Sequence, residues 1–378
     1  MSGMFGVSTA DRADAQAQEA RRARLSWLAV SLVDGVPVCD LPWMQTDTLE
    51  YHLMEGTTQQ LHLPFDHLPV NWEDATVPGG VAYILLQDET PIWGGLLVGV
   101  HSDLSGTGLD LKVDTVETYL ERCPTGDLLY RGQEQTRIVS DIVTRAAVNG
   151  MRNCIMARSD PSATRRDREY KDTDDKSVLS AIQELACVRG GPEWGHWWER
   201  ADDGSYRCVI TARDHYGSED PVTDFDVSRM TGFSLDLDAS GTALANRVRA
   251  VSTAEGDVRP MSSWVEYKDP ARPVWPLSFT PSTSITDVGT LEAHARRRLD
   301  SRRTGTVTHS IDLDLLTAPR LGVEWRPGDV VRWDAGDSAR VMPGDTAGMA
   351  RVIGYKVGFT GSWTLTPILQ EGAVDNEQ

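Results

Sequence analysis

Residues 81–100, VAYILLQDETPIWGGLLVGV, decide how the first part of the chain is expected to fold. Two apolar runs, at 81–87 and 92–100, flank a short polar turn. Apolar runs of this length around a turn are typical of a β-hairpin. Gly94 and Gly95 lie inside the second run and do not lead into a helix, so they indicate a bulge or close backbone approach and not a dinucleotide-binding loop.

Strand-like alternation of apolar and polar residues continues on both sides of this hairpin. In residues 48–54 every second side chain is apolar, from Leu49 to Leu53, which places the apolar side chains on one face of an extended chain. Further strands are expected at 26–33, 36–40, 59–65 and 109–114. So many short strands with short turns predict a small β-barrel or sandwich.

Beyond Asp114 the apolar residues take helical spacing and then return to alternation. Helices are predicted over 136–147, 176–188 and 291–303, the second with Asp174 or Asp175 near its N-cap. We therefore predict a mainly β protein with α+β insertions. The expected division is an N-terminal arm (1–25), a first small β-barrel (26–115), a helical and mixed α/β insertion (116–230), a mixed β/α segment (231–305), a second small β-barrel (306–370) and a flexible tail (371–378).

The net charge excludes some classes of protein. The 378 residues include 37 Lys and Arg against 56 Asp and Glu, a formal charge of −19. So acidic a surface repels phosphate backbones and anionic lipids, which excludes nucleic-acid or membrane-surface binding by the whole molecule but not by a local basic patch. No apolar run approaches the roughly 18 residues of a membrane span. The N-terminus also lacks a signal-peptide pattern, so we expect the chain to fold in a cytoplasm.

Residue types that carry out catalysis or bind metals form no recognisable pattern. The eight histidines include no H-E-x-x-H, H-x-H or H-x-x-x-H spacing, and neither G-x-S-x-G nor a Walker loop is present. The five cysteines are odd in number and contain no C-x-x-C, which argues against a disulfide framework or a zinc site. We expect no catalytic residue, no metal site and no cofactor, and thus no enzyme.

Two further features indicate contact surfaces. The chain has 12 Trp against 6 Phe, and Trp is favoured at interfaces, although ordinary strand packing also uses it. The Trp residues expected at exposed places are Trp43, Trp72, Trp194, Trp197, Trp198, Trp264 and Trp275. An arginine cluster, from Arg296 to Arg303, lies on the third predicted helix. We expect it to pair with acidic groups of this chain or of another subunit.

The order of several short motifs resembles that in minor tail proteins of siphoviruses that infect actinobacteria. The similarity spans roughly residues 26–370. The chain departs from this pattern at Cys123, where a second Arg is common. The residues that carry the resemblance are Trp93-Gly94-Gly95, Tyr119-Leu120-Glu121-Arg122, Tyr130 through Gln135, Asn246-Arg247-Val248 and Pro327-Gly328-Asp329-Val330.

The resemblance implies a baseplate hub-like fold with two β-barrel tube domains. Three copies around the tail axis would then give six barrels. It further implies a structural protein of the virion tail, assembled in the host cytoplasm, that closes the tail tube and opens for genome ejection. The implied partners are the distal tail protein, the tape-measure protein and tail fibre or spike proteins, while genomic DNA passes without specific binding.

Physical considerations support this reading, and other readings stay open. Small barrels with exposed edge strands need a partner, which a closed ring supplies, and an acidic wall does not bind passing DNA. The alternatives are a distal tail protein or a receptor module that binds carbohydrate through surface Trp such as Trp197 or Trp198. A tail-associated cell-wall hydrolase is a third alternative.

Overall fold

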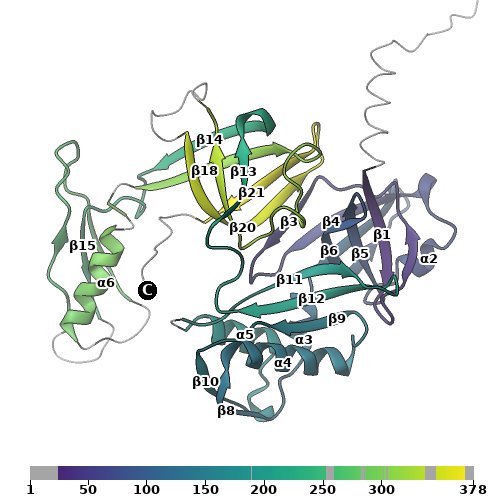
Figure 1. The fold of residues 1–378 in the computed structure, drawn as a ribbon, viewed down its shortest axis with the longest axis horizontal. Coiled ribbons are helices and arrows are strands. Elements are labelled where there is room, and N and C mark those ends of the chain that lie inside the picture. The colour runs from purple at the N-terminus through teal and green to yellow at the C-terminus, as the bar shows by residue number, and fades with distance from the viewer. Residues whose placement is uncertain are drawn as a thin grey trace, which may run out of the picture. The chain divides into compact units, whose positions relative to one another are not determined.

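The computed structural model describes residues 24–188, 190–252, 259–281, 285, 287–300, 302–303, 305–336 and 346–370. It is mainly β, with 45% strand and 17% helix, as predicted (Figure 1). The described residues belong to two compact units. Unit 1 draws on Met1–Thr231, Asp312–Gly336 and Ala347–Ile368, and unit 2 on Gly232–Ile311, Asp337–Thr346 and Leu369–Gln378. The predicted arm, apart from residues 24 and 25, and the predicted tail at 371–378 lie outside the described residues.

Unit 1 begins with an antiparallel sheet in the order β2-β1-β5-β6-β7-β4. Its strands are β1 (Leu25–Ser31), β2 (Pro37–Asp40), β4 (Thr58–Pro64), β5 (Val81–Gln87), β6 (Thr90–His101) and β7 (Gly108–Asp114). The predicted hairpin is confirmed as β5–β6. Its turn places Asp88 and Glu89 at φ 47° and 67°, the left-handed conformation that matches the twist of two-residue hairpin turns.

The predicted first barrel is wrong in one respect: none of the sheets closes into a barrel within the described part of the chain. The gap in this sheet lies between its end strands β2 and β4. Just after β2, the N–H of Leu41 bonds to Trp27 of β1 (2.8 Å), and Pro42, which follows, has no N–H to offer a further strand. The chain instead crosses to β4, where Gln45 and His62 form a single bridge. The short helices η1 (Phe65–His67) and α2 (Trp72–Ala75) follow β4.

The middle of unit 1 is an α/β layer. A three-stranded sheet, β11-β12-β9, packs against α4, and β8 pairs with β10. The helices predicted over 136–147 and 176–188 are confirmed, but Ser177 caps the second one by accepting a bond from the Ser180 N–H (3.1 Å). The elements are α3 (Glu117–Arg122), β8 (Leu128–Glu134), α4 (Gln135–Asn149), β9 (Ile155–Ser159), β10 (Arg165–Tyr170), η2 (Asp172–Asp174), α5 (Val178–Ala186), β11 (Glu193–Arg200) and β12 (Tyr206–Arg213).

Seven strands form the second large sheet, in the order β13-β19-β20-β21-β18-β14, with β3 also paired to β20. They are β3 (Thr48–His52), β13 (Pro221–Asp226), β14 (Met230–Asp238), β18 (Thr306–Asp314), β19 (Val330–Asp334), β20 (Ala347–Gly358) and β21 (Thr364–Leu369), with η3 (Val227–Arg229) between β13 and β14. The sheet is open, because β13 and β14 end its path. One of its strands, β3, comes from the segment that was expected in the first barrel. The prediction of a second barrel is therefore wrong as well. The boundaries between the units fall within β14 and β18.

Unit 2 contains a small sheet with one helix. Strand β15 (Arg247–Ala250) lies between β16 (Val265–Glu266) and β17 (Pro276–Phe279). Helix α6 (Val288–Asp300), in the region predicted at 291–303, packs against this sheet. The buried core of the pair consists of Ala245, Val248, Ala250, Leu291, Ala295 and Leu299.

The glycine pair in β6 marks a close approach of two layers of unit 1. A Cβ atom at Gly94 would lie 2.5 Å from Cδ1 of Trp198 on β11, whose ring is buried. A Cβ atom at Gly99, on the same strand, would meet only Lys112 Cβ at 3.5 Å. The glycine at position 94 is therefore needed for the first sheet to pack on β11.

We predict that Gly94→Ala destabilises the fold by about 1–3 kcal/mol, because the buried ring cannot withdraw without repacking. Gly99→Ala is the control, and it should be neutral or stabilising by up to about 1 kcal/mol. Urea unfolding of both variants measures the difference. Equal stabilities for the two would contradict the close approach of β6 to Trp198.

Candidate functional site

A hollow in unit 1 lies where the first sheet fails to close. It is a cavity of about 660 Å³, within the roughly 300–1,000 Å³ range of small-molecule sites. Apolar side chains of three strands, Trp27, Leu61 and Leu85, contribute to its lining, and Met44 lies in the segment between β2 and β3. The cavity thus lies between β1, β4, β5 and the segment that follows β2.

Aromatic rings stand at the rim of this cavity. Trp43 is 37% exposed and stacks on His67 with centroids 4.0 Å apart and planes 12° apart, so one face of the indole is already supported. Phe359 and Trp363, beside the turn between β20 and β21, form an edge-to-face pair at 5.9 Å. A ligand in the cavity would therefore meet rigid aromatic surfaces from two directions.

The polar groups around the cavity are acidic or neutral. Asp110 Oδ1 lies 2.8 Å from His62 Nδ1, and the other ring nitrogen lies 3.3 Å from the Thr107 hydroxyl. Asp47 adds a second carboxylate, and among the described residues that line the cavity none is Lys or Arg. The cavity suits a neutral or cationic ligand that combines an apolar face with hydroxyl or amine groups.

A second polar pair in unit 1 is sealed inside the protein. His196 Nδ1 lies 2.9 Å from Glu117 Oε1, and both side chains are 3% exposed. Tyr51 covers the imidazole, its hydroxyl accepts a bond from the His196 N–H (3.3 Å), and burial raises the pKa of that hydroxyl. The adjacent cavity measures about 10 Å³, room for about one water molecule. A substrate has no space at this pair, so the contact between the two side chains has a structural role.

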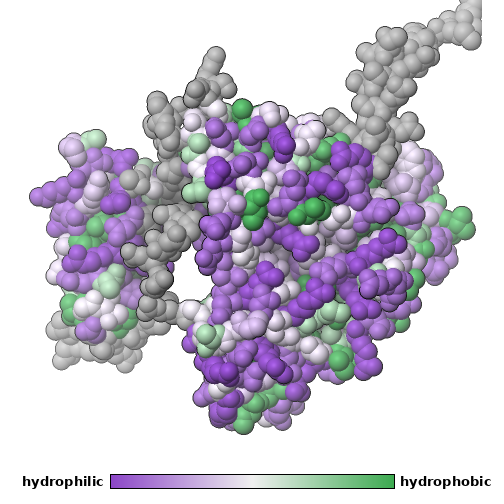
Figure 2. Space-filling view, in the orientation of Figure 1, coloured by the Kyte–Doolittle hydropathy of each residue, from purple (hydrophilic) through white to green (hydrophobic). Residues whose placement is uncertain are grey.

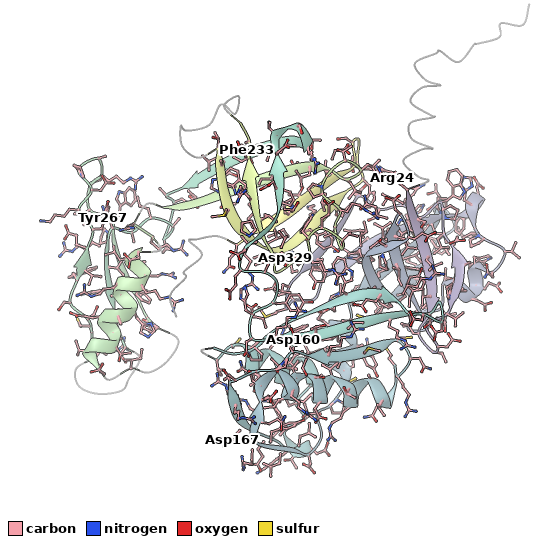
Figure 3. All side chains as sticks on the ribbon, viewed as in Figure 1. Arg24, Asp160, Asp167, Phe233, Tyr267 and Asp329 are labelled. Carbon is pink, nitrogen blue, oxygen red and sulfur yellow. The ribbon has the colours of Figure 1, made fainter. Side chains whose placement is uncertain are left out.

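A third polar cluster in unit 1 holds Arg351 of β20. Its guanidinium donates two bonds to the Glu193 carboxylate, one of 2.9 Å, and further bonds to the carbonyl oxygens of Tyr216 (2.7 Å) and Gly328 (3.0 Å). Burial opposes ionisation of Glu193, but Arg351 and the Tyr216 N–H outweigh it and lower the pKa of the carboxyl. Asp329, labelled in Figure 3, accepts the Ser218 N–H (2.9 Å). The Pro327-Gly328-Asp329 motif is therefore a structural turn at this ion pair.

The exposed-tryptophan prediction is wrong for three residues. Trp194, Trp197 and Trp198 lie in β11 and are buried, because this strand is covered on both faces. Trp72 is half-buried, whereas Trp43, Trp264 and Trp275 are exposed. The cavity was not anticipated from the sequence.

No group of three or more His, Cys, Asp or Glu among the described residues is placed to hold a metal ion. None of the helices described is long and apolar enough to cross a membrane.

No protein-family model matches the sequence, and a search of curated proteins found no match. Solved structures, however, share the fold over most of the chain. A 43 kDa tail protein of prophage MuSo2 from Shewanella oneidensis is 8% identical with a TM-score of 0.57, covering 91% of this chain and 98% of the other. A tail protein from Neisseria meningitidis is 14% identical with a TM-score of 0.53, covering 92% and 97%. A chain of the Francisella PdpA–VgrG complex is 9% identical with a TM-score of 0.51, covering 92% and 52%. The chain therefore has the fold of phage tail proteins.

We predict that Glu193→Gln destabilises unit 1 by about 3–5 kcal/mol at neutral pH, since it leaves a buried guanidinium without its counter-charge. The lowered pKa of Glu193 sets the direction of the pH effect. The stabilisation that the ionised Glu193 carboxylate gives to the fold is present above the ordinary glutamate pKa of about 4.3 and is lost as the pH falls below that value. Urea unfolding between pH 3 and 8 should show that the variant lacks this part of the wild-type pH dependence.

Glu199→Gln is the matched control on the same strand. Glu199 pairs with Arg158 at the surface (3.0 Å), and exposed pairs contribute about 0–1 kcal/mol. A Glu193→Gln effect no larger than that of Glu199→Gln would contradict a stabilising role for the buried pair.

Proposed function

We propose that this chain is a structural protein of a long-tailed bacteriophage, the hub that closes the tail tube at its tip. The observation that supports it most is that the similarity to two tail proteins covers over 90% of this chain and of each of theirs. Two proteins that shared only an insertion or a single domain would match over only a part of each chain. The space beside the Glu117–His196 pair is too small for a substrate, so this acid–base pair gives no support to an enzymatic role.

In this proposal three copies surround the tail axis. They join the distal tail ring and the tape-measure protein to fibres or spikes, and open for genome ejection. The second sheet offers an edge for such contacts, since β13 ends its path and carries the exposed Val222, and edge strands favour pairing with another chain. The net charge of −19 suits a wall that DNA passes without binding. The actinobacterial siphovirus origin rests on the sequence motifs.

We expect antibodies against the chain to label the tail tip of purified virions in electron micrographs. The purified protein should also reach three times its 41.6 kDa monomer mass at micromolar concentration, measured by light scattering. Labelling of the capsid, or no labelling of virions, would contradict the tail role. A mass of six chains would instead favour a distal tail ring protein.

A second candidate function is recognition of a host glycan. Trp197 and Trp198 cannot support it because they are buried, but the cavity beside Trp43 has the aromatic and acidic surfaces that sugars bind. A carbohydrate-binding tail protein would use this cavity as its receptor site.

Under that candidate, soluble fragments of host cell-wall polysaccharide should bind the protein, and Trp43→Ala should weaken binding at least about fivefold, the equivalent of roughly 1 kcal/mol of lost stacking. Trp275→Ala is the control, because Trp275 is similarly exposed and lies outside the cavity. Calorimetric titration measures both. No wild-type binding, or equal weakening in both variants, would exclude the glycan role.

A further inference from the structure

The small sheet of unit 2 has two chemically different faces. Along β15, Val248 and Ala250 are buried against α6. Successive side chains of a strand point to opposite faces, so Arg247 and Arg249 lie on the face away from the helix. Neighbouring strands agree, because Leu277 and Phe279 pack on the helix side while Ser278 bonds to Arg249. We call the side away from α6 the arginine face, made of Arg247, Arg249, Trp264, Glu266 and Ser278.

Two guanidinium groups on the arginine face share one indole ring. The guanidinium carbons of Arg249 and Arg247 lie 4.7 and 5.0 Å from the centre of the Trp264 ring. Arg249 also donates from Nε to the Ser278 hydroxyl (3.1 Å), and Arg247 lies 3.8 Å from Glu266. Stacking and hydrogen bonding fix the plane of the Arg249 guanidinium, so little side-chain freedom is lost when it binds a planar anion.

Arg249 has no acidic partner of its own among the described residues. No carboxylate of those residues lies within 4.0 Å of its guanidinium, and its side chain is half-buried on the arginine face. The unit that carries α6 and β15 shows a mainly hydrophilic surface in Figure 2. A fixed guanidinium with free N–H groups at the surface is a donor for a carboxylate or phosphate.

The charges of the chain are unevenly distributed between this segment and the rest. Residues 232–311 hold ten Lys and Arg against nine Asp and Glu, whereas the remaining 298 residues hold 27 against 47. The segment is therefore near +1 in a chain whose remainder is near −20. The acidic remainder of one copy is electrostatically complementary to the arginine face of another, and such complementarity favours specific association.

We propose that the arginine face binds carboxylate groups on unit 1 of a second copy of this chain. The proposal rests on the oligomeric assembly in the proposed function and assigns one contact within it. A carboxylate surface fits better than DNA for two reasons. Both guanidinium groups already occupy the Trp264 ring, which cannot then stack freely on a base. Two arginines are also few against the repulsion between a polyanion and an acidic molecule.

The first test measures self-association of the full-length chain by analytical ultracentrifugation. The Arg247→Glu/Arg249→Glu variant should weaken association at least about tenfold, because it places like charges in contact. Its control is Arg296→Glu/Arg297→Glu, which makes the same charge change on the exposed side of α6. Arg249→Lys keeps the charge, loses the flat guanidinium and should give an intermediate effect. Circular dichroism confirms that each variant is folded.

The second test places a photo-crosslinking amino acid at position 264 in a mixture of isotopically light and heavy chains. Light-to-heavy crosslinks that map to unit 1 are the expected result. Association of the glutamate variant equal to that of the control, crosslinks only within one chain, or labelled DNA that crosslinks in their place would each overturn the proposal. If one of these results is obtained and virions still carry the protein at the tail tip, only this inference fails. If virions do not carry the protein there, the proposed function fails too.

Discussion

A buried positive charge, that of Arg351, constrains how the segments of unit 1 are assembled. An ion inside a protein is stable only when its donors are satisfied, and here the acceptors come from β11, from Tyr216 and from the turn at Gly328. These groups are distant in sequence and must meet at one point. The neighbouring aromatic stack of Tyr51 on Tyr355, at 5.5 Å, packs β3 against β20 beside it. Arg351 thus ties the second sheet to β11 of the α/β layer, beside an aromatic stack within the second sheet.

Some buried polar groups of unit 1 join distant elements, as Glu193 and Arg351 do. The space beside the Glu117–His196 pair is only about 10 Å³. The groups that remain available lie on surfaces: the cavity rim at Trp43, the edge strand β13 and the arginine face of unit 2.

Local features of this protein could be predicted from its sequence, and long-range partners could not. The hairpin at 81–100 and helix α4 were predicted because their periodicity lies within a few adjacent residues. The alternation of β3 indicated a strand, but it contains no information about whether β7 or β20 is the partner. Trp197 and Trp198 were expected at the surface. Their strand is covered on both faces, and such a strand has no regular alternation of apolar and polar residues from which its burial could be predicted. The Glu193–Arg351 pair joins residues 158 apart, which no motif of the single sequence indicated. The cavity depends on where β4 lies relative to β1 and β5, which no local signal of the sequence indicated.

The pairing of β3 with β20 has a consequence for how the chain acquires its structure during synthesis. Residue Tyr51 is opposite Tyr355 in this ladder, so about 300 residues must leave the ribosome before the early strand meets its partner. Contacts of such sequence separation form slowly, and the apolar surface that awaits them is prone to aggregate. Until the last strands are released, β3 therefore lacks the neighbour that it pairs with in the folded chain.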